Sequence, residues 1–190
     1  SREKFSKDMK KLLKSQNSSD TKFLVISPDG KTEESFHLHS PILRARSAWF
    51  SSYFTQGWKE SDSQQIVIRD LEPTTFRILI EYLYTDNLPQ CEPDSLVELL
   101  SFSDQINLVH LKDLCQIQLQ EYLHVDSIFD LYHHCLTHQA NQLSQVCLQF
   151  ISQEENFTKL EREIEQKIDD TSIQVKLKQD YEYYSKYSKI

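Results

Sequence analysis

Apolar and polar positions at the start of the chain follow two different periods. An apolar stripe at helical spacing stands among lysines and consists of Phe5, Met9, Leu12 and Leu13. The stripe predicts an amphipathic helix over residues 3–15. Two strand-like runs follow over 22–26 and 34–38, and the turn sequence of residues 27–30 separates them. This part of the chain therefore predicts a helix followed by a β-hairpin.

Helical patterns dominate the remainder of the chain. Ser40 before Pro41, and then Ser47, are capping signals that predict a pair of short helices ending near Gly57. Residues 65–68 predict a third strand. Apolar stripes predict further helices that open at Pro73, after a cap at Asp94, over about 109–122, over 127–137 after a cap at Asp126, over 140–152 and over 157–168. The predicted fold class is α+β followed by an all-helical extension, and the structure of 171–190 is left open.

The composition is typical of a soluble globular protein and excludes several enzyme classes. The 190 residues suffice for one ordinary domain or two small ones, and 38% of them are apolar, 26% charged and 11% aromatic. The two glycines, Gly30 and Gly57, lie far apart. Dinucleotide-binding loops, phosphate-binding loops and nucleophile elbows each need several glycines within a few residues. We therefore expect none of these sites.

The charge of the chain is negative overall and unevenly distributed. A net charge of -8 argues against a nucleic-acid partner, because phosphate contacts require a basic face. Residues 1–14 carry six Lys and Arg with two acids, whereas residues 154–170 carry seven Asp and Glu. The basic start is interpreted as a solvated helix face, with contact to an acidic partner as the alternative.

The chain carries no signal for a membrane or for secretion. No apolar run is long enough to span a bilayer, and the start of the chain lacks the apolar core of a signal peptide, so no membrane partner is expected. Cys91, Cys115, Cys135 and Cys147 show no close pairing, and the last three occupy apolar helical positions, as buried reduced thiols do. These cysteines predict an intracellular protein, cytoplasmic or nuclear. Ser1 as first residue suggests a fragment of a longer chain.

Short motifs between residues 20 and 115 follow a fixed order. Up to the third predicted strand they are Asp20-x-x-Phe-x-Val25, Phe36-His-Leu-His39, Ile42-Leu43-Arg-Ala45-Arg-Ser47-x-x-Phe50 and Gly57-Trp-Lys-Glu-Ser61. From that strand onward they are Ile66-Val-Ile, Phe76, Glu81-Tyr-Leu-Tyr-Thr85 and Leu108-x-x-Leu111-Lys-x-x-Cys115. The order resembles that of BTB/POZ domains over about residues 3–122. The resemblance implies a small sheet flanked by helices, and we expect a BTB/POZ domain over residues 1–122.

Residues 123–157 resemble the first helices of a BACK domain, and we expect a partial BACK-like helical region over residues 123–190. Ala140-Asn-Gln-Leu143 and Cys147-Leu-Gln-Phe150-Ile151 carry this second resemblance. BTB domains commonly dimerise through their first helix. The resemblance therefore implies a homodimer whose interface contains Phe5, Met9, Leu12 and Leu13. In such a two-fold dimer the same surface of both copies is in contact. Packing of the stripe within one chain is the alternative.

Trp58-Lys59-Glu60 resembles the hydrophobic-x-Glu element by which many BTB proteins bind cullin-3, the scaffold of a ubiquitin ligase. A large aromatic side chain can fill an apolar pocket of a partner, and the Glu60 carboxylate can fix the register. Local or dimer packing of Trp58 is the alternative. The family geometry would place further residues near this cullin-binding surface, namely Phe54, Tyr122, Ile128 and Tyr132. The resemblance thus implies an adaptor that presents an unknown ubiquitination substrate through a domain outside this sequence.

Two other BTB classes provide alternative functions. BTB modules of transcriptional regulators recruit corepressors through a charged groove in which an Asp near the first strand pairs with a basic residue. Asp20 matches this Asp, but Ser40 occupies the basic position. Tetrameric channel-assembly modules usually lack the helices that follow residue 118 in this chain. The cullin-3 adaptor is therefore the preferred interpretation.

We expect no catalytic residue, no cofactor and no metal site. A Ser-His-Asp or Cys-His arrangement cannot be assigned without knowledge of spatial neighbours. Candidate metal ligands are clustered in one short segment, namely His133, His134, Cys135 and His138. His134 and His138 lie one helical turn apart and could share a zinc ion, but a second ligand pair at short spacing is missing. A polar helix face is the preferred interpretation of this cluster.

Overall fold

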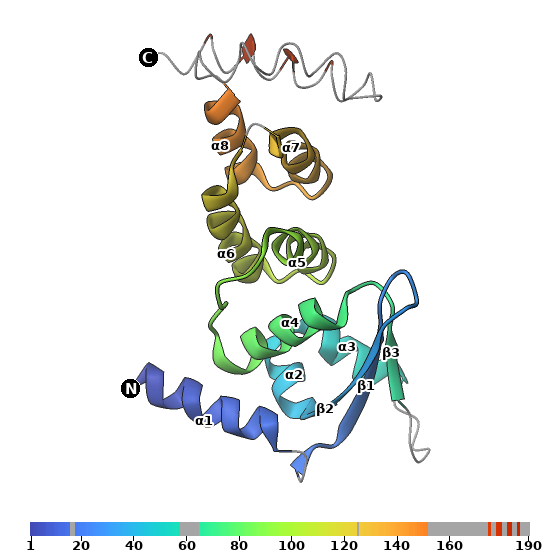
Figure 1. The fold of residues 1–190 in the computed structure, drawn as a ribbon. Coiled ribbons are helices and arrows are strands. Elements are labelled where there is room, and N and C mark those ends of the chain that lie inside the picture. The colour runs from blue at the N-terminus through green and yellow to red at the C-terminus, as the bar shows by residue number, and fades with distance from the viewer. Residues whose placement is uncertain are drawn as a thin grey trace. The chain divides into compact units, whose positions relative to one another are not determined.

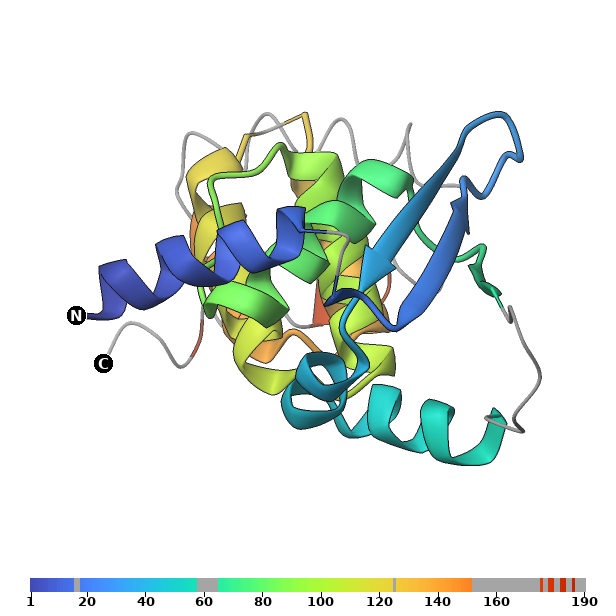
Figure 2. The same cartoon turned by 90° about the horizontal axis from the view of Figure 1, so that it is seen from below.

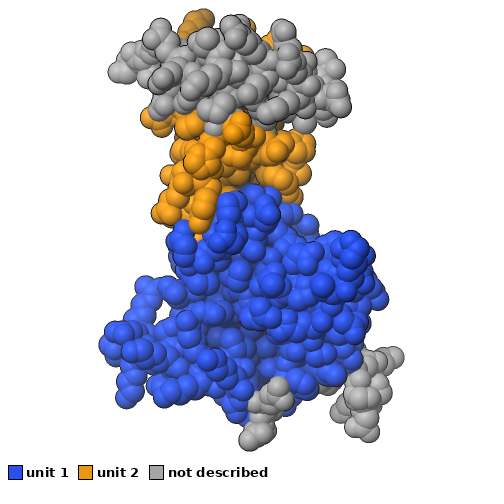
Figure 3. All heavy atoms as spheres, in the orientation of Figure 1, with its two compact units in different colours: residues 1–115 blue, residues 116–190 orange. Residues whose placement is uncertain are grey.

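The structure is a computed structural model in which the described residues form two compact units. The described residues are 1–15, 18–57, 65–124 and 126–151, together with the single positions 175, 178, 179, 182, 183 and 186. The two units comprise residues 1–115 and 116–190 and are coloured separately in Figure 3. The predictions for 157–168 and for most of 171–190 lie outside the described residues. The predicted α+β class is confirmed, since a small sheet is combined with many helices.

A three-stranded sheet forms one part of the first unit (Figure 1). The central strand β1 (Thr21–Ile26) pairs antiparallel with β2 (Glu33–Leu38) and parallel with β3 (Gln65–Ile68). The predicted hairpin and third strand are therefore confirmed. In the turn between β1 and β2, Gly30 has φ 73°, a left-handed conformation that glycine adopts without steric strain from a Cβ atom.

Aromatic side chains fill the space between the sheet and the helices. Phe23 of β1 is fully buried, and its ring centroid lies 5.9 Å from that of Phe50 and 5.7 Å from that of Phe76. The Phe36 ring of β2 lies 5.0 Å from Phe76. Phe76 belongs to α4 (Pro73–Thr85), most of whose residues are buried. Each such aromatic pair contributes about 0.5–1.5 kcal/mol beyond the burial of its area. Because most of its residues are buried and Phe76 contacts two strands, α4 is the central helix of this unit.

The predicted N-terminal helix forms as α1 (Arg2–Lys14) and packs along α4 of its own chain (Figures 1 and 2). Two ion pairs join the helices. Arg2 lies 3.3 Å from the Asp86 carboxylate, and Lys10 lies 2.7 Å from the Glu81 carboxylate. None of the α1 residues is fully buried. The contact is therefore peripheral, and it leaves part of the apolar stripe accessible.

The predicted helical pair is present as α2 (Ser40–Arg46) and α3 (Ala48–Gly57). The cap at Ser47 is present, because the Phe50 N–H donates to Ser47 Oγ over 3.4 Å. The predicted cap at Ser40 is wrong, since His39 occupies the N-cap position and Ser40 is the first helical residue. The cap instead comes from a distant segment, because the Ser40 N–H donates to Asp20 Oδ1 over 2.7 Å.

Two further helix starts differ from the predictions. In α5 (Pro93–Gln105) the N-cap is Glu92 rather than Asp94, because Pro93 takes the first helical position, where a missing N–H costs nothing. In α7 (Ile128–Thr137) the N-cap is Ser127 rather than Asp126. The predicted helix over 109–122 is α6 (Val109–Leu119), which continues as a 3₁₀ turn, η2 (Gln120–Tyr122).

The second unit contains a helical hairpin in which α7 packs against α8 (Asn141–Ile151). Gln116 is buried and supports the start of α8, because its Oε1 accepts a 3.2 Å hydrogen bond from the Leu143 N–H. The division between the two units falls within α6. Among the helices of the described residues, none combines the length and the apolar character that crossing a bilayer requires.

All four cysteines are buried and outside any disulfide, which confirms the buried thiols predicted at Cys115, Cys135 and Cys147. Burial is the main reason that the pKa of the Cys91 thiol rises to about 11 and that of Cys115 to about 12. In the second unit, a hydrogen bond with Cys135 and burial raise the pKa of Cys147. These thiols therefore remain protonated at neutral pH and contribute to packing.

Candidate interaction surface

Two aromatic stripes run along adjacent faces of α3, about 100° apart around the helix. Phe50 and Phe54 point inward and are buried, and their ring centroids lie 5.9 and 6.4 Å from that of Phe23. Residues four apart share one helix face, so this pair anchors α3 on the sheet. The other stripe, Trp49 and Tyr53, is offset by one residue and faces outward. The helix is thus anchored by two buried rings and carries a second, partly exposed pair of rings on the neighbouring face.

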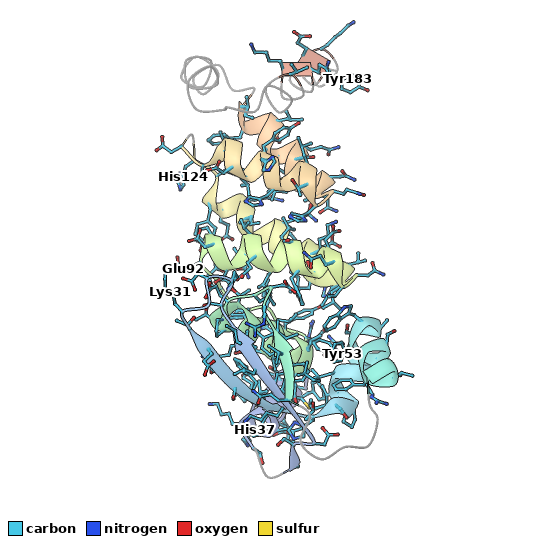
Figure 4. All side chains as sticks on the ribbon, turned by 90° about the vertical axis from the view of Figure 1, so that its right-hand side faces the viewer. Lys31, His37, Tyr53, Glu92, His124 and Tyr183 are labelled. Atoms are coloured by element: carbon cyan, nitrogen blue, oxygen red, sulfur yellow. The ribbon has the colours of Figure 1, made fainter. Side chains whose placement is uncertain are left out.

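The outward stripe is a preorganised apolar surface. The Trp49 and Tyr53 rings lie 5.5 Å apart at an interplanar angle of 31°. Trp49 is half-buried and also meets the Phe102 ring of α5, at 6.1 Å. Tyr53 is 40% exposed and is labelled beside α3 in Figure 4. Because Trp49 packs against both rings, Tyr53 is presented from a fixed base.

The two principal residues predicted to bind cullin, Trp58 and Glu60, lie outside the described residues. α3 ends at Gly57, so their segment begins directly after this helix. Phe54 was predicted near the same surface, but its side chain is only 1% exposed. The Arg44 guanidinium lies 5.3 Å from the centre of its ring. Phe54 therefore supports α3 from within rather than offering its ring to a partner.

The remaining predicted cullin-binding residues belong to the second unit. Ile128 and Tyr132 of α7 are 0% and 1% exposed, so their side chains pack in the core of that unit. Tyr122 in η2 is half-buried and remains a candidate contact residue. Phe54 lies in the first unit, so the six predicted residues do not form one described cluster. Sequence periodicity missed Tyr53, although its i, i+4 spacing from Trp49 was the available signal.

The predicted dimer residues lie along α1 with graded exposure. Met9, Leu12 and Leu13 are half-buried, whereas Phe5 is 55% exposed. At 3.6 residues per turn, Met9 and Leu13 lie on the side of the helix that also carries Arg2 and Lys10, the residues paired with α4. Phe5 and Leu12 lie on the flank. The α4 contact thus accounts for one part of the apolar stripe and leaves the other part accessible.

Asp20 and Ser40, which stand where corepressor-binding BTB domains have a charge pair, are joined by hydrogen bonds instead. The Asp20 carboxylate accepts a hydrogen bond of 2.7 Å from the Ser40 N–H and another of 2.6 Å from Ser40 Oγ. Both oxygens of Asp20 therefore hold the start of α2. Asp20 serves as a helix cap here, which disfavours the alternative function as a corepressor groove.

A Ser–His contact occurs in the first unit as part of a hydrogen-bond network with Tyr84. His39 Nε2 lies 2.8 Å from Ser18 Oγ, and His39 Nδ1 lies 2.8 Å from the Tyr84 hydroxyl. The Tyr84 oxygen also accepts the His39 backbone N–H over 2.9 Å. The His39 ring thus bridges Ser18 and Tyr84, which links the segment before β1 to α4.

The histidine cluster lies on α7 and at its C-terminal end. The rings of His134 and His138 are nearly parallel, with centroids 6.3 Å apart, and the His133 ring lies 6.1 Å from that of His134. Burial and the two neighbouring histidines lower the pKa of His134. Within the described part of the chain, His, Cys, Asp and Glu side chains form no group of three or more that could hold a metal ion.

Comparisons with known proteins identify the family of the first unit. The BTB/POZ domain model matches residues 9–123. The BTB/POZ and MATH domain-containing protein 3 of Arabidopsis thaliana is 31% identical over 159 residues, which cover 78% of this chain and 38% of that protein. The inhibitor of Bruton tyrosine kinase from Xenopus laevis is 27% identical over 132 residues, which cover 67% of this chain and 10% of that protein. The chain thus spans less than two fifths of either relative.

Among solved structures, the BTB domain of zebrafish PATZ1 matches with a TM-score of 0.48 and 19% sequence identity, over 62% of this chain and 90% of that one. The family model alone covers more than half of the 190 residues, from the stripe of α1 to the end of the η2 turn. The motifs between residues 20 and 115 thus lie within one matched domain, and this chain belongs to the BTB/POZ domain family.

Proposed function

We propose that this BTB/POZ module is a dimeric, non-enzymatic adaptor that docks cullin-3 at the end of α3 and carries a ubiquitination substrate through a separate domain. The BTB/POZ family is one of protein-interaction modules, and many of its members bind cullin-3 through a hydrophobic-x-Glu element. Trp58 and Glu60 match that element in this chain. An adaptor of this type would act in the cytoplasm or nucleus, where its free cysteines stay reduced.

The construction of α3 is the observation that supports this docking site best. Phe50 and Phe54 fix the helix in the core, while Tyr53 is presented outward one helical turn before Gly57. Trp58 follows directly in sequence. Buried aromatic anchors often contribute about 2 kcal/mol or more to a protein interface, and preorganisation lowers the entropy cost of binding. A rim carboxylate such as Glu60 adds about 0–1 kcal/mol and fixes orientation.

The second unit contributes one candidate contact residue to the proposal. The α7–α8 hairpin is interpreted as the start of a partial BACK domain, in line with the motifs at 140–143 and 147–151. Ile128 and Tyr132 then stabilise this hairpin from within, and half-buried Tyr122 provides the candidate contact. The proposal therefore assigns docking to α3 and to the segment after it, with Tyr122 in a supporting role.

The accessible flank of α1 is the proposed dimer interface. Phe5 and Leu12 form its apolar centre, and Met9 and Leu13 connect it to α4. A two-fold axis beside this flank would bury the same side chains of both copies. Dimerisation gives an adaptor two substrate sites and two cullin sites. Tethering then raises the effective concentration of the substrate near the ligase, so that ubiquitin transfer becomes nearly intramolecular.

Binding to the N-terminal region of cullin-3, measured by isothermal titration calorimetry, tests the docking site. Trp58→Ala is expected to weaken binding about 30-fold or more, and Glu60→Lys and Tyr53→Ala to weaken it by smaller factors. Tyr183→Ala is the matched control, since Tyr183 is also an exposed tyrosine but belongs to the second unit. Absence of binding by the wild-type chain would overturn the adaptor function. Full binding by Trp58→Ala and Glu60→Lys would overturn only the site.

Light scattering coupled to size-exclusion chromatography tests the dimer. The wild-type chain is expected at twice its monomer mass of 22.5 kDa, and the double variant Phe5→Glu and Leu12→Glu at the monomer mass. The double variant Val67→Glu and Val109→Glu places the same two charges on other exposed apolar residues and should leave the dimer intact. A wild-type monomer at micromolar concentration would contradict the proposed dimer without affecting the cullin site.

A further inference from the structure

The outer side of α1 carries four lysines in one row. Lys4, Lys7, Lys11 and Lys14 recur at spacings of three or four residues, so they share one face of the helix. All four are exposed. We call this row the α1 lysine strip. At 1.5 Å per residue it extends over about 15 Å, and it concentrates positive charge on a chain whose net charge is -8.

The helix α1 has three faces of different character. The face with Met9 and Leu13 lies toward α4, where Arg2 and Lys10 are paired with acidic side chains. The flank with Phe5 is the apolar surface described above. The lysine strip lies on the third face, away from α4. The ion pairs to α4 thus use two basic residues of α1 and leave the strip directed to solvent.

The interactions of the strip within α1 are weak and exchangeable. Lys7 lies 3.0 Å from Glu3, and Lys11 lies 3.8 Å from Asp8. The side chains of Lys7 and Lys11 are 70% and 80% exposed. Ion pairs between exposed side chains on one helix stabilise little and are screened by salt, so a partner carboxylate can replace either acid. The strip is therefore available to an external anion.

We propose that the α1 lysine strip is a docking site for an acidic peptide segment of a partner protein. Charge complementarity defines this occupant. An extended chain rises about 3.3 Å per residue, so a run of about five residues spans the strip and can place alternating or consecutive carboxylates near the lysines. Such a segment gains electrostatic attraction without burying apolar surface. The site differs from the cullin surface on α3 and does not depend on it.

The arrangement of α1 favours a peptide over a membrane surface. An interfacial helix buries its apolar face beneath the headgroups while its basic side chains reach the phosphates. In α1 the apolar residues Met9 and Leu13 lie on the α4 side. The accessible pair Phe5 and Leu12 is assigned to the proposed dimer interface, on which this exclusion rests. A long polyanion such as DNA would also meet repulsion from the net charge of -8. A short acidic segment avoids both problems.

Fluorescence anisotropy with fluorescein-labelled hexaglutamate and the full chain tests the proposal at low ionic strength. We expect saturable binding that weakens as salt is added. Replacing three strip lysines while keeping the Lys7–Glu3 pair should weaken binding about tenfold. The strip variant combines Lys4→Gln, Lys11→Gln and Lys14→Gln. The control variant removes the same charge from exposed positions elsewhere through Lys22→Gln, Lys31→Gln and Arg69→Gln, and should change binding less than about twofold.

Three results would overturn the proposal. One is the absence of hexaglutamate binding, and another is equal weakening by the strip and control variants, which would indicate a nonspecific effect of net charge. The third is strip-dependent binding to phosphatidylserine vesicles without binding to hexaglutamate, which would assign the strip to a lipid surface. Labelled hexalysine is the probe control, because its binding to this acidic chain should not weaken in the strip variant. Circular dichroism verifies that α1 remains folded in each variant.

Discussion

The Tyr84 hydroxyl lies 2.8 Å from His39 Nδ1 and also accepts the His39 backbone N–H over 2.9 Å. The two residues are 45 positions apart in sequence. Tyr84 stands near the end of α4, and His39 is the N-cap of α2. Both residues are buried. The contact thus ties the central helix to the junction between the sheet and the helical pair that ends in α3.

Tyr84→Phe is expected to lower the free energy of unfolding by about 1–3 kcal/mol, because the His39 N–H and ring lose a buried partner. Urea denaturation at neutral pH measures the change. Tyr53→Phe is the control, since Tyr53 is exposed and its loss of a hydroxyl should cost less than about 0.5 kcal/mol. An equal effect of the two variants would show that the Tyr84 hydroxyl does not stabilise this junction.

Arg46 connects α2 to the C-terminal end of α4. Its Nε donates to the Leu83 carbonyl over 3.1 Å, and its Nη2 donates to the Asp86 carboxylate. Asp86 has a left-handed backbone, with φ 57°, and closes α4. The hydrogen bond from Arg46 is the main reason that the pKa of Asp86 lies below its usual value of 3.8. Arg46 thus binds a carbonyl in the last turn of α4 and also stabilises the negative charge of Asp86, the C-cap residue of the same helix.

Arg46→Met is expected to lower the free energy of unfolding at neutral pH by about 1 kcal/mol, because two hydrogen bonds are lost at a site that solvent partly screens. The pKa of Asp86 should rise toward 3.8. Because the wild-type pKa is depressed, the ionised pair stabilises the fold above about pH 4, and this contribution is lost as the pH falls through the folded-state pKa. Urea melts over a pH series and NMR titration of Asp86 measure both effects. Arg69→Met, at an exposed position, should leave them unchanged.

Local sequence signals predicted most elements but not their long-range supports. The turn at 27–30 and the stripes of α1 and α4 depend on residues close in sequence, so periodicity and turn chemistry suffice. The cap of α2 comes from Asp20, and the Glu72 N–H before α4 donates to Glu98 of α5 over 2.7 Å. Such caps depend on tertiary contacts. The parallel pairing of β3 with β1 is likewise a tertiary outcome.

The site could be predicted only in part, for a physical reason that α3 illustrates. Two aromatic stripes, Phe50 with Phe54 and Trp49 with Tyr53, have the same spacing and similar hydrophobicity. Their periodicity shows that each pair shares a face but not which face meets the sheet. Contacts with Phe23 decide this, and they turn Phe54 inward and leave Tyr53 outside. The interface role of Trp58 and Glu60 stays a prediction.

We expect the stability of the second unit to depend on pH through His134. Burial, followed by His133 and His138, lowers the pKa of His134 from 6.5, whereas Asp130 opposes this shift. The fold therefore prefers neutral His134. Its contribution is fully present above about pH 6.5 and is lost as the pH falls toward the depressed folded-state pKa, because the unfolded chain takes up the proton first.

His134→Gln should therefore reduce the loss of thermal stability between about pH 7 and about pH 5. Thermal denaturation followed by circular dichroism at both pH values measures the effect. The control is His124→Gln, because His124 is exposed and lies before α7 (Figure 4). If His134→Gln and wild type lose the same stability in acid, the buried imidazole does not control this response.

Gln116 gives the sharpest test of how the second unit is held together. The side chain is buried, and its Oε1 accepts the Leu143 N–H at the start of α8, where helical N–H groups lack partners within the helix. Gln116→Leu keeps a similar volume but removes the acceptor. We expect the free energy of unfolding to fall by about 1–3 kcal/mol, measured by urea denaturation. Gln145→Leu makes the same change at an exposed position of α8 and should have little effect. Equal stability of the two variants would mean that α8 does not need this cap, and that its packing on α7 alone holds the hairpin.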